Sequence, residues 1–185
     1  SAENRTSSIA EVEKNRFQRN FANPLKNQIN ELAAAFDESG ADPYFIVSTY
    51  TLAEHSIERH SSGISALSSD DGEGQWNLEN TSNIVRLFRE DIAEYTIEKY
   101  AKYGKDAFSE EELRTLSPAT RAKVEQGVAV DSLTDSEKME IGEVKIEVLW
   151  RLINRLNNET LNIAQRAGLK SREEIALIKS HNWKY

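Results

Sequence analysis

The longest hydrophobic pattern in the chain runs from Thr134 to Ala167 and predicts one long helix of about 50 Å. Its start carries a capping box, Thr134 with Glu137, and Gly168 stands where a left-handed C-cap belongs. Apolar or small residues recur along it at spacings of three and four: Met139, Gly142, Ile146, Leu149, Ile153, Leu156, Thr160, Ile163 and Ala167. Further apolar residues lie beside this stripe: Val144, Val148, Trp150 and Leu152. We predict that this is the buried central helix of an all-helical domain.

A second helical pattern starts at Ile9 and continues to Asp37, with Pro24 in its middle. Its apolar residues are Phe17, Phe21, Leu25, Ile29, Leu32 and Phe36. One kinked helix or two abutting helices both fit, and the single helix is favoured because the apolar stripe keeps its phase across Pro24. Residues 1–8 are polar and are expected to form a frayed tail.

Two further long helices are predicted between Asp42 and Tyr103. Asp42 and Pro43 open the first, because they combine an N-cap residue with proline at the first helical position. Its apolar face is Ile46, Tyr50, Ala53, Ile57, His60, Ile64 and Leu67. Ser68 to Gly74 form an acidic, glycine-containing loop. The next helix runs from about Thr81 to Tyr103 and ends at Gly104.

Short helices complete the predicted fold. Capping signals at Ser109 and Ser117 indicate two short helices in an insert at about residues 105–133. Ser171 with Glu174 begins a short C-terminal helix. The predicted fold is therefore all-α: a four-helix bundle of long helices, with the helical insert between the third and fourth. Residues 9–185 form its single domain.

Composition excludes several classes of protein. The chain has 185 residues, which suits one domain, and a net charge of -8, which argues against nucleic-acid binding. Without cysteine it has no disulfide and no thiolate metal site. No segment approaches the ~18 apolar residues of a membrane span. The first residue is Ser1 rather than methionine, so a leader or membrane anchor upstream is compatible with the sequence.

The segment from Glu54 to His60 has the highest density of residue types that occur in catalytic and metal sites. Glu54 and Glu58 lie one helical turn apart, whereas His55 and His60 are five residues apart and point in different directions around a helix. The Glu-x-x-His pattern of di-iron bundles and the paired histidines of zinc proteases are both missing. The favoured interpretation is that His60 is a partly buried residue of the helix face and that the others are solvated.

Asparagines line two of the predicted helices. Asn20, Asn23, Asn27 and Asn30 follow one strip of the first helix, and Asn154, Asn157, Asn158 and Asn162 cluster on the long central helix. Wet helix faces are the favoured interpretation. If the two strips face each other, they instead form polar helix contacts or a polar ligand cleft.

Two other groups of residues have a structural and a functional interpretation. Glu90, Asp91, Glu94 and Glu98 form an acidic face, which is interpreted as solvated and offset by Arg86, Arg89, Lys99 and Lys102. In the C-terminal tail, Trp183 and Tyr185 are expected to dock on the bundle, and binding of a partner or a membrane interface is the alternative.

Function follows by elimination, because the sequence contains no hydrolase, phosphate-binding or dinucleotide-binding motif and indicates no cofactor. The main hypothesis is a non-catalytic interaction or sensing domain. It would be the soluble, extracytoplasmic part of a membrane-anchored protein whose anchor lies upstream, which favours the cell envelope over the cytoplasm. Its partner would be a protein or a small polar ligand, and not nucleic acid. The candidate contacts are His55, Glu58, His60, Asn27, Asn30, Asn154, Asn158 and Trp183.

Two alternatives belong to other classes. The first is a metal-dependent helical-bundle enzyme that uses Glu54, His55, Glu58 and His60. The second is a cytoplasmic adaptor or assembly subunit that forms a homodimer through an exposed helix face.

Overall fold

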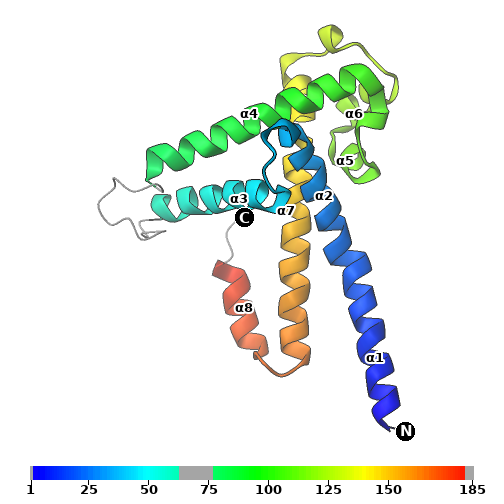
Figure 1. Ribbon diagram of the computed structural model, residues 1–185, viewed down its shortest axis with the longest axis vertical. Coiled ribbons are helices and arrows are strands. Elements are labelled where there is room, and N and C mark those ends of the chain that lie inside the picture. The colour runs from blue at the N-terminus through cyan, green and yellow to red at the C-terminus, as the bar shows by residue number, and fades with distance from the viewer. Residues whose placement is uncertain (1, 63–76, 182–185) are drawn as a thin grey trace.

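The computed structural model describes residues 2–62 and 77–181, and these residues form helices joined by short turns, with no strand among them (Figure 1). The all-α class is confirmed. The predicted loop at Ser68–Gly74 and the tail residue Trp183 lie outside the described residues. Within the described ranges, no helix combines the length and the apolar character needed to cross a membrane.

The first helical segment runs from Ala2 to Ser39, changes its winding at three points and kinks at Phe36, whose backbone angles (φ -118°, ψ 17°) are not helical. It comprises α1 (Ala2–Phe17), a π-helical turn (Gln18–Ala22), α2 (Asn23–Ala33) and a 3-10 turn (Ala34–Ser39). The predicted single helix therefore does continue through Pro24. Residues 2–8, for which a frayed tail was expected, form the start of α1 and are all exposed.

The π-helical turn is explained by Pro24. Proline lacks an N–H group, and its ring crowds the carbonyl group four residues earlier, so a wider turn relieves the clash. The Asn23 N–H accordingly donates to the Gln18 carbonyl, five residues back. The Asn20 carbonyl, which would accept from residue 24 in a regular α-helix, lies 3.5 Å from a guanidinium nitrogen of Arg155.

Capping side chains set the starts of α3 (Pro43–Ser61) and α4 (Leu78–Tyr103). Asp42 accepts the Phe45 N–H at 3.1 Å, as the sequence predicts. The structure begins α4 three residues before the predicted Thr81, because the Asn77 side chain accepts the Asn80 N–H at 2.8 Å. Cap residues satisfy N–H groups that have no partner within the helix, so they decide where a helix begins.

The rest of the chain contains the insert, the long helix and the last helix. The insert comprises a 3-10 turn (Gly104–Ala107), α5 (Glu110–Thr115), α6 (Pro118–Glu125) and a second 3-10 turn (Val130–Ser132). The long helix is α7 (Asp135–Arg166), and the last is α8 (Arg172–His181). Three predicted helix starts have capping boxes: Ser109 with Glu112, Thr134 with Glu137, and Ser171 with Glu174.

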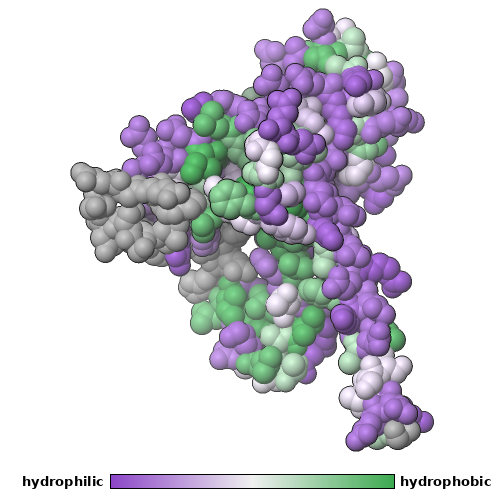
Figure 2. All heavy atoms as spheres, in the orientation of Figure 1, coloured by the Kyte–Doolittle hydropathy of each residue, from purple (hydrophilic) through white to green (hydrophobic). Residues whose placement is uncertain are grey.

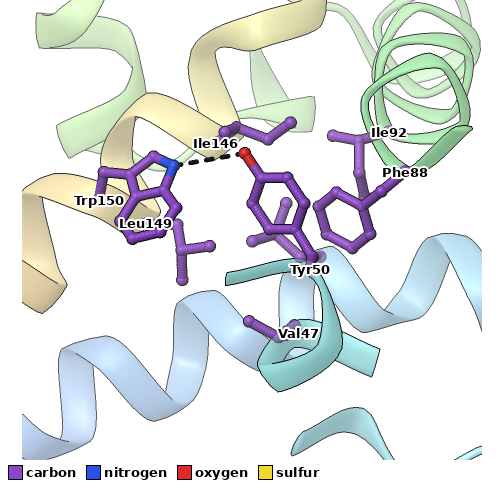
Figure 3. Close-up of a cluster of buried hydrophobic side chains, with 8 residues drawn as sticks. Val47, Tyr50, Phe88, Ile92, Ile146, Leu149 and Trp150 are labelled. Atoms are coloured by element: carbon purple, nitrogen blue, oxygen red, sulfur yellow. Dashed lines mark hydrogen bonds between the residues drawn. The ribbon is translucent and has the colours of Figure 1, made fainter. Parts of the chain in front are cut away.

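The main core lies where α2, α3, α4 and α7 meet. Leu32, Tyr50, Ile92 and Leu149, one from each helix, are fully buried there, and Figure 3 shows the cluster around Tyr50. In Figure 1, α3 and α4 lie across α7 rather than alongside it. Four helices therefore surround the core, but the predicted bundle of long helices running side by side is not confirmed.

A second core attaches the insert to α4 and α7. Its buried residues are Tyr100, Ala107, Phe108, Leu116, Val124, Leu133, Ile141 and Val144. Between the two cores α4 and α7 approach closely at Gly142, where an added Cβ would lie 2.9 Å from the Cβ of Ala93. Glycine at this position therefore allows the two backbones to come together.

Only the first half of α7 is enclosed. Its buried residues begin at Ile141 and end at Leu152, and none of Ile153–Arg166 is buried. The helices α3 and α4 cross the first half of α7 (Figure 1). The second half is flanked by α1, by α8 and by the π-helical turn, whose Asn20 carbonyl accepts from Arg155. Arg16 pairs with Glu159 there at 3.1 Å, and Ile175 of α8 is buried. The predicted buried central helix is therefore enclosed in its first half and not in its second.

Hydrophobic residues remain visible on the surface of this lower part of the molecule. In Figure 2 they gather over α8 and the adjoining end of α7. Ile163, Leu169 and Leu177 are among the exposed large apolar residues.

Candidate functional site

The Glu54–His60 segment of α3 does not form a common site. Glu54 is buried, the side chains of His55 and Glu58 are half-buried, and His60 is exposed rather than part of the buried face. Their directions differ because consecutive residues of a helix are separated by about 100°. Within residues 2–62 and 77–181, no group of three or more His, Cys, Asp and Glu side chains is arranged to hold a metal ion. One oxygen of Glu58, Oε2, is buried without a hydrogen-bond partner among these residues.

Glu54 instead accepts hydrogen bonds from inside the core. Its Oε1 lies 2.8 Å from the Tyr50 hydroxyl and 2.8 Å and 3.0 Å from two Arg89 nitrogens. The indole N–H of Trp150 donates in turn to the Tyr50 oxygen at 3.3 Å (Figure 3). Burial, together with the charge of Glu54, raises the pKa of Tyr50 well above its usual value. These contacts connect α3, α4 and α7 and use Glu54 as a structural acceptor.

The two asparagine strips do not share a cavity. Asn27 and Asn30 are exposed on α2, and Asn27 lines a small cavity of about 270 Å³ beside the insert. Asn154 and Asn158 line a different cleft on α7, of about 580 Å³, together with Trp150 and Arg155. Asn27 and Asn158 thus line separate cavities, and from α2 it is Gln28 that donates to the α7 backbone, at the Lys145 carbonyl, at 2.9 Å.

The structure gathers a set of charged residues that the sequence reasoning missed. Lys145 of α7 is completely buried, and its Nζ lies 3.0 Å and 3.1 Å from the two carboxylate oxygens of Glu112. It also lies 3.1 Å from Glu31 of α2 and donates to the Ala107 carbonyl at 3.1 Å. Gln28 donates to Glu112 at 3.2 Å. Burial of an ammonium group is tolerated only when such partners surround it.

A second lysine extends this cluster to the surface. Lys99 of α4 donates to Glu31 Oε1 at 2.7 Å. Burial would raise the pKa of Glu31, but the hydrogen bond from Lys99 and the charge of Lys145 lower it below its usual value. Burial would lower the pKa of Lys99, and Glu31 raises it overall. The charges of the cluster are therefore used to hold α2, α4, α5 and α7 together.

A sequence signal for this cluster exists. Lys145 lies between Val144 and Ile146, in the stretch that contains Ile141, Val148, Leu149 and Leu152. A lysine surrounded by apolar neighbours at helical spacing indicates a buried cation that needs a carboxylate partner. Glu112 gives no such signal, because its place in a capping box already explains it: its Oε1 accepts the Ser109 N–H at 2.8 Å.

Outside the core, α3 and α4 enclose an apolar groove of about 280 Å³, which we call the α3/α4 groove. It is lined by Phe36, Phe45, Ile46, Thr49, Tyr50, Ile84, Leu87, Phe88 and Asp91. Phe45 is 68% exposed and Leu87 is 50% exposed, whereas Phe88 is buried at the base of the groove. Sequence reasoning missed it because Phe45 and Leu87 do not belong to the periodic faces from which the helices were predicted.

The α3/α4 groove has a rigid aromatic floor. The Phe36 and Phe88 rings are stacked with centroids 5.4 Å apart, and the Tyr50 and Phe88 rings are stacked at 4.1 Å. Tyr50 is also held by Glu54 and Trp150. The floor of the groove is therefore aromatic and apolar, and its lining contains no nucleophile activated by a base.

Comparisons with known proteins add no assignment: no family model, no curated protein and no solved structure matches this chain.

Proposed function

We propose that this chain is a non-catalytic helical interaction domain that binds a protein partner. The ionisable groups of its interior serve internal contacts, and an apolar groove faces outward. This combination favours binding over chemistry.

The interior charges are committed to the fold. A catalytic acid, base or nucleophile must reach a substrate, within hydrogen-bond distance of the proton or atom that it attacks. Lys145 has no exposed surface, and Glu112 is 1% exposed, so neither can do so without unfolding its neighbours. Glu54 already accepts from Tyr50 and Arg89.

The single observation that carries the proposal is the α3/α4 groove. Phe45 and Leu87 stand exposed over stacked aromatic rings. Exposed apolar residues scattered singly are ordinary, but large ones gathered around a groove mark a contact surface. Aromatic residues at the centre of such a surface supply most of the binding energy in protein complexes.

Site-specific photo-crosslinking in the cells that produce the protein tests the proposal. A benzophenone amino acid placed at Leu87 is expected to yield a discrete adduct heavier than the 21.0 kDa chain. The same probe at Met139, which is 64% exposed near the start of α7 and does not line the groove, is the control and should not yield that adduct. Adding Phe45→Ala to the Leu87 probe should reduce the adduct, since Phe45 lines the same groove.

The mass of the adduct distinguishes the partners. A mass of twice the chain would identify a second copy of this protein and support the homodimer. No adduct at Leu87, or equal adducts at Leu87 and Met139, would contradict the α3/α4 groove as a binding site.

A further inference from the structure

We infer that the α3/α4 groove selects a basic amphipathic helix: a partner segment with an apolar stripe and lysine or arginine beside it. This inference rests on the proposed function and specifies the partner's chemistry. Three properties of the groove carry it: its lining, the charge around it and the pairing of the nearest cations.

The lining fits the apolar stripe of a helix. Phe45 and Ile46 come from α3, and Ile84 and Leu87 come from α4, so two helices form the opposite sides of the groove. A helix that lies in such a groove inserts residues spaced by three, four and seven positions. The stacked floor of Phe36, Phe88 and Tyr50 limits how deep these residues can go.

The surface around the groove is acidic. Asp91 lines the groove itself, Asp37 follows the lining residue Phe36, and Asp42 accepts the N–H of the lining residue Phe45. All three are exposed. Along α4, the face that carries Ile84, Leu87 and Asp91 continues at spacings of three and four to the exposed Glu94 and Glu98.

Few cations offset this charge. The sequence has no lysine or arginine between Lys26 and Arg59, so none lies among the groove residues from Phe36 to Tyr50. On the α4 side, Arg86 pairs with Glu90 at 3.2 Å, and Arg89 pairs with the buried Glu54 at 2.8 Å. An apolar groove with an acidic border attracts a cationic partner and repels an acidic one. An anionic membrane surface is disfavoured for the same reason.

Two synthetic peptides test the inference. Both are helical, about 18 residues long and five turns, with leucine on one face. One carries lysine at all other positions, and the other carries glutamate there. Binding of each fluorescently labelled peptide to the full chain is measured by anisotropy. The lysine peptide is expected to bind saturably and more weakly as salt is raised, and the glutamate peptide is expected to bind at least about tenfold more weakly.

Variants locate the binding. Leu87→Ala should weaken binding of the lysine peptide about tenfold. The control Met139→Ala, at an exposed apolar residue outside the groove, should leave binding unchanged. Asp91→Lys should weaken binding of the lysine peptide several-fold more than Asp131→Lys does. Asp131→Lys is the control, because it makes the same change of net charge in the insert, far from the groove. The circular dichroism spectrum and melting temperature of each variant show whether it has kept its fold.

The outcomes separate this inference from the proposed function. Equal binding of both peptides, lost with Leu87→Ala, would overturn the preference for a basic helix and leave the α3/α4 groove as a binding site. If the lysine peptide binds the Leu87→Ala variant as tightly as the unmodified protein, its binding reflects general attraction to an acidic protein. That result would overturn the inference. Absence of binding by either peptide would also overturn it, while the crosslinking result at Leu87 would still decide the proposed function.

Discussion

The ammonium group of Lys145 lies 3.0 Å from a carboxylate oxygen of Glu112, and neither side chain has more than 2% of its surface exposed. This pair joins α7 to the insert through α5 and brings Glu31 of α2 into the same cluster. A buried pair of this kind is weak as a source of stability, because desolvation offsets much of its Coulomb energy. Removing one partner is costly, because the other charge stays buried.

We therefore expect Lys145→Met to destabilise the fold by about 3 kcal/mol, since it leaves Glu112 without a cation. Arg114→Met is the control: Arg114 makes an exposed ion pair with Glu110 at 2.8 Å, and its loss should cost less than about 1 kcal/mol. Urea unfolding followed by circular dichroism measures both. Adding Glu112→Gln to Lys145→Met should recover part of the loss. Equal costs for Lys145→Met and Arg114→Met would contradict a buried ionic cluster.

The free energy of unfolding should depend on pH in the acid range through the ionisation of Glu31. Because the pKa of this carboxyl is lower in the folded protein than in the unfolded chain, its contribution is fully present above its unfolded-state pKa of about 4.3. The contribution is lost as the pH falls through the lowered folded-state value.

Urea unfolding at several pH values between about 6 and 3 measures this effect. Glu31→Gln should make the free energy of unfolding less dependent on pH over that range than it is in the unmodified protein. Glu90→Gln changes a carboxylate in an exposed pair with Arg86 and should leave the dependence nearly unchanged. An identical pH dependence in the unmodified protein and in Glu31→Gln would show that Glu31 is not coupled to the lysines.

The close approach of α4 and α7 predicts that Gly142→Ala destabilises the protein. Alanine favours a helix over glycine by about 1 kcal/mol, so the substitution would be stabilising in an open position. Here the new Cβ would lie 2.9 Å from the Cβ and 3.3 Å from the Cα of Ala93, and one helix would have to move. Overpacking of this kind costs about 1–3 kcal/mol.

Thermal unfolding measures the change at Gly142. Combining Ala93→Gly with Gly142→Ala removes the contact between the two Cβ atoms. The melting temperature of this double variant should therefore be higher than the sum of the two single shifts in melting temperature predicts. A stabilising Gly142→Ala would mean that the two helices are further apart than described.

Much of the local structure could be predicted from short stretches of sequence. The capping box of Thr134 and Glu137, the Asp42–Pro43 helix start and the glycine after α7 all act over a few residues. The same holds for the long helix, whose start at Asp135 follows directly from its cap. The apolar periodicity predicts a start of α4 at Thr81, later than the observed Leu78, because the N-cap residue Asn77 precedes the periodic apolar residues by several positions.

The candidate contacts could not be predicted equally well. Glu54 and His60 lie on different sides of one helix, and the position of α4, whose Arg89 pairs with Glu54, decides which side is buried. The α3/α4 groove likewise depends on two helices that are separated by 16 residues of the chain, between Ser61 and Leu78.

The sequence by itself determined that the chain is helical and where most helices begin and end, because helix periodicity and capping depend on neighbours within about four residues. Only the tertiary structure decided that α3 and α4 cross α7, so that burial stops at Leu152 and leaves the distal half of the helix partly exposed. It also decided that Lys145 meets Glu112, 33 residues away in the chain. Both outcomes depend on how closely whole helices approach and at what angle, which is set by side chains distant in sequence packing together.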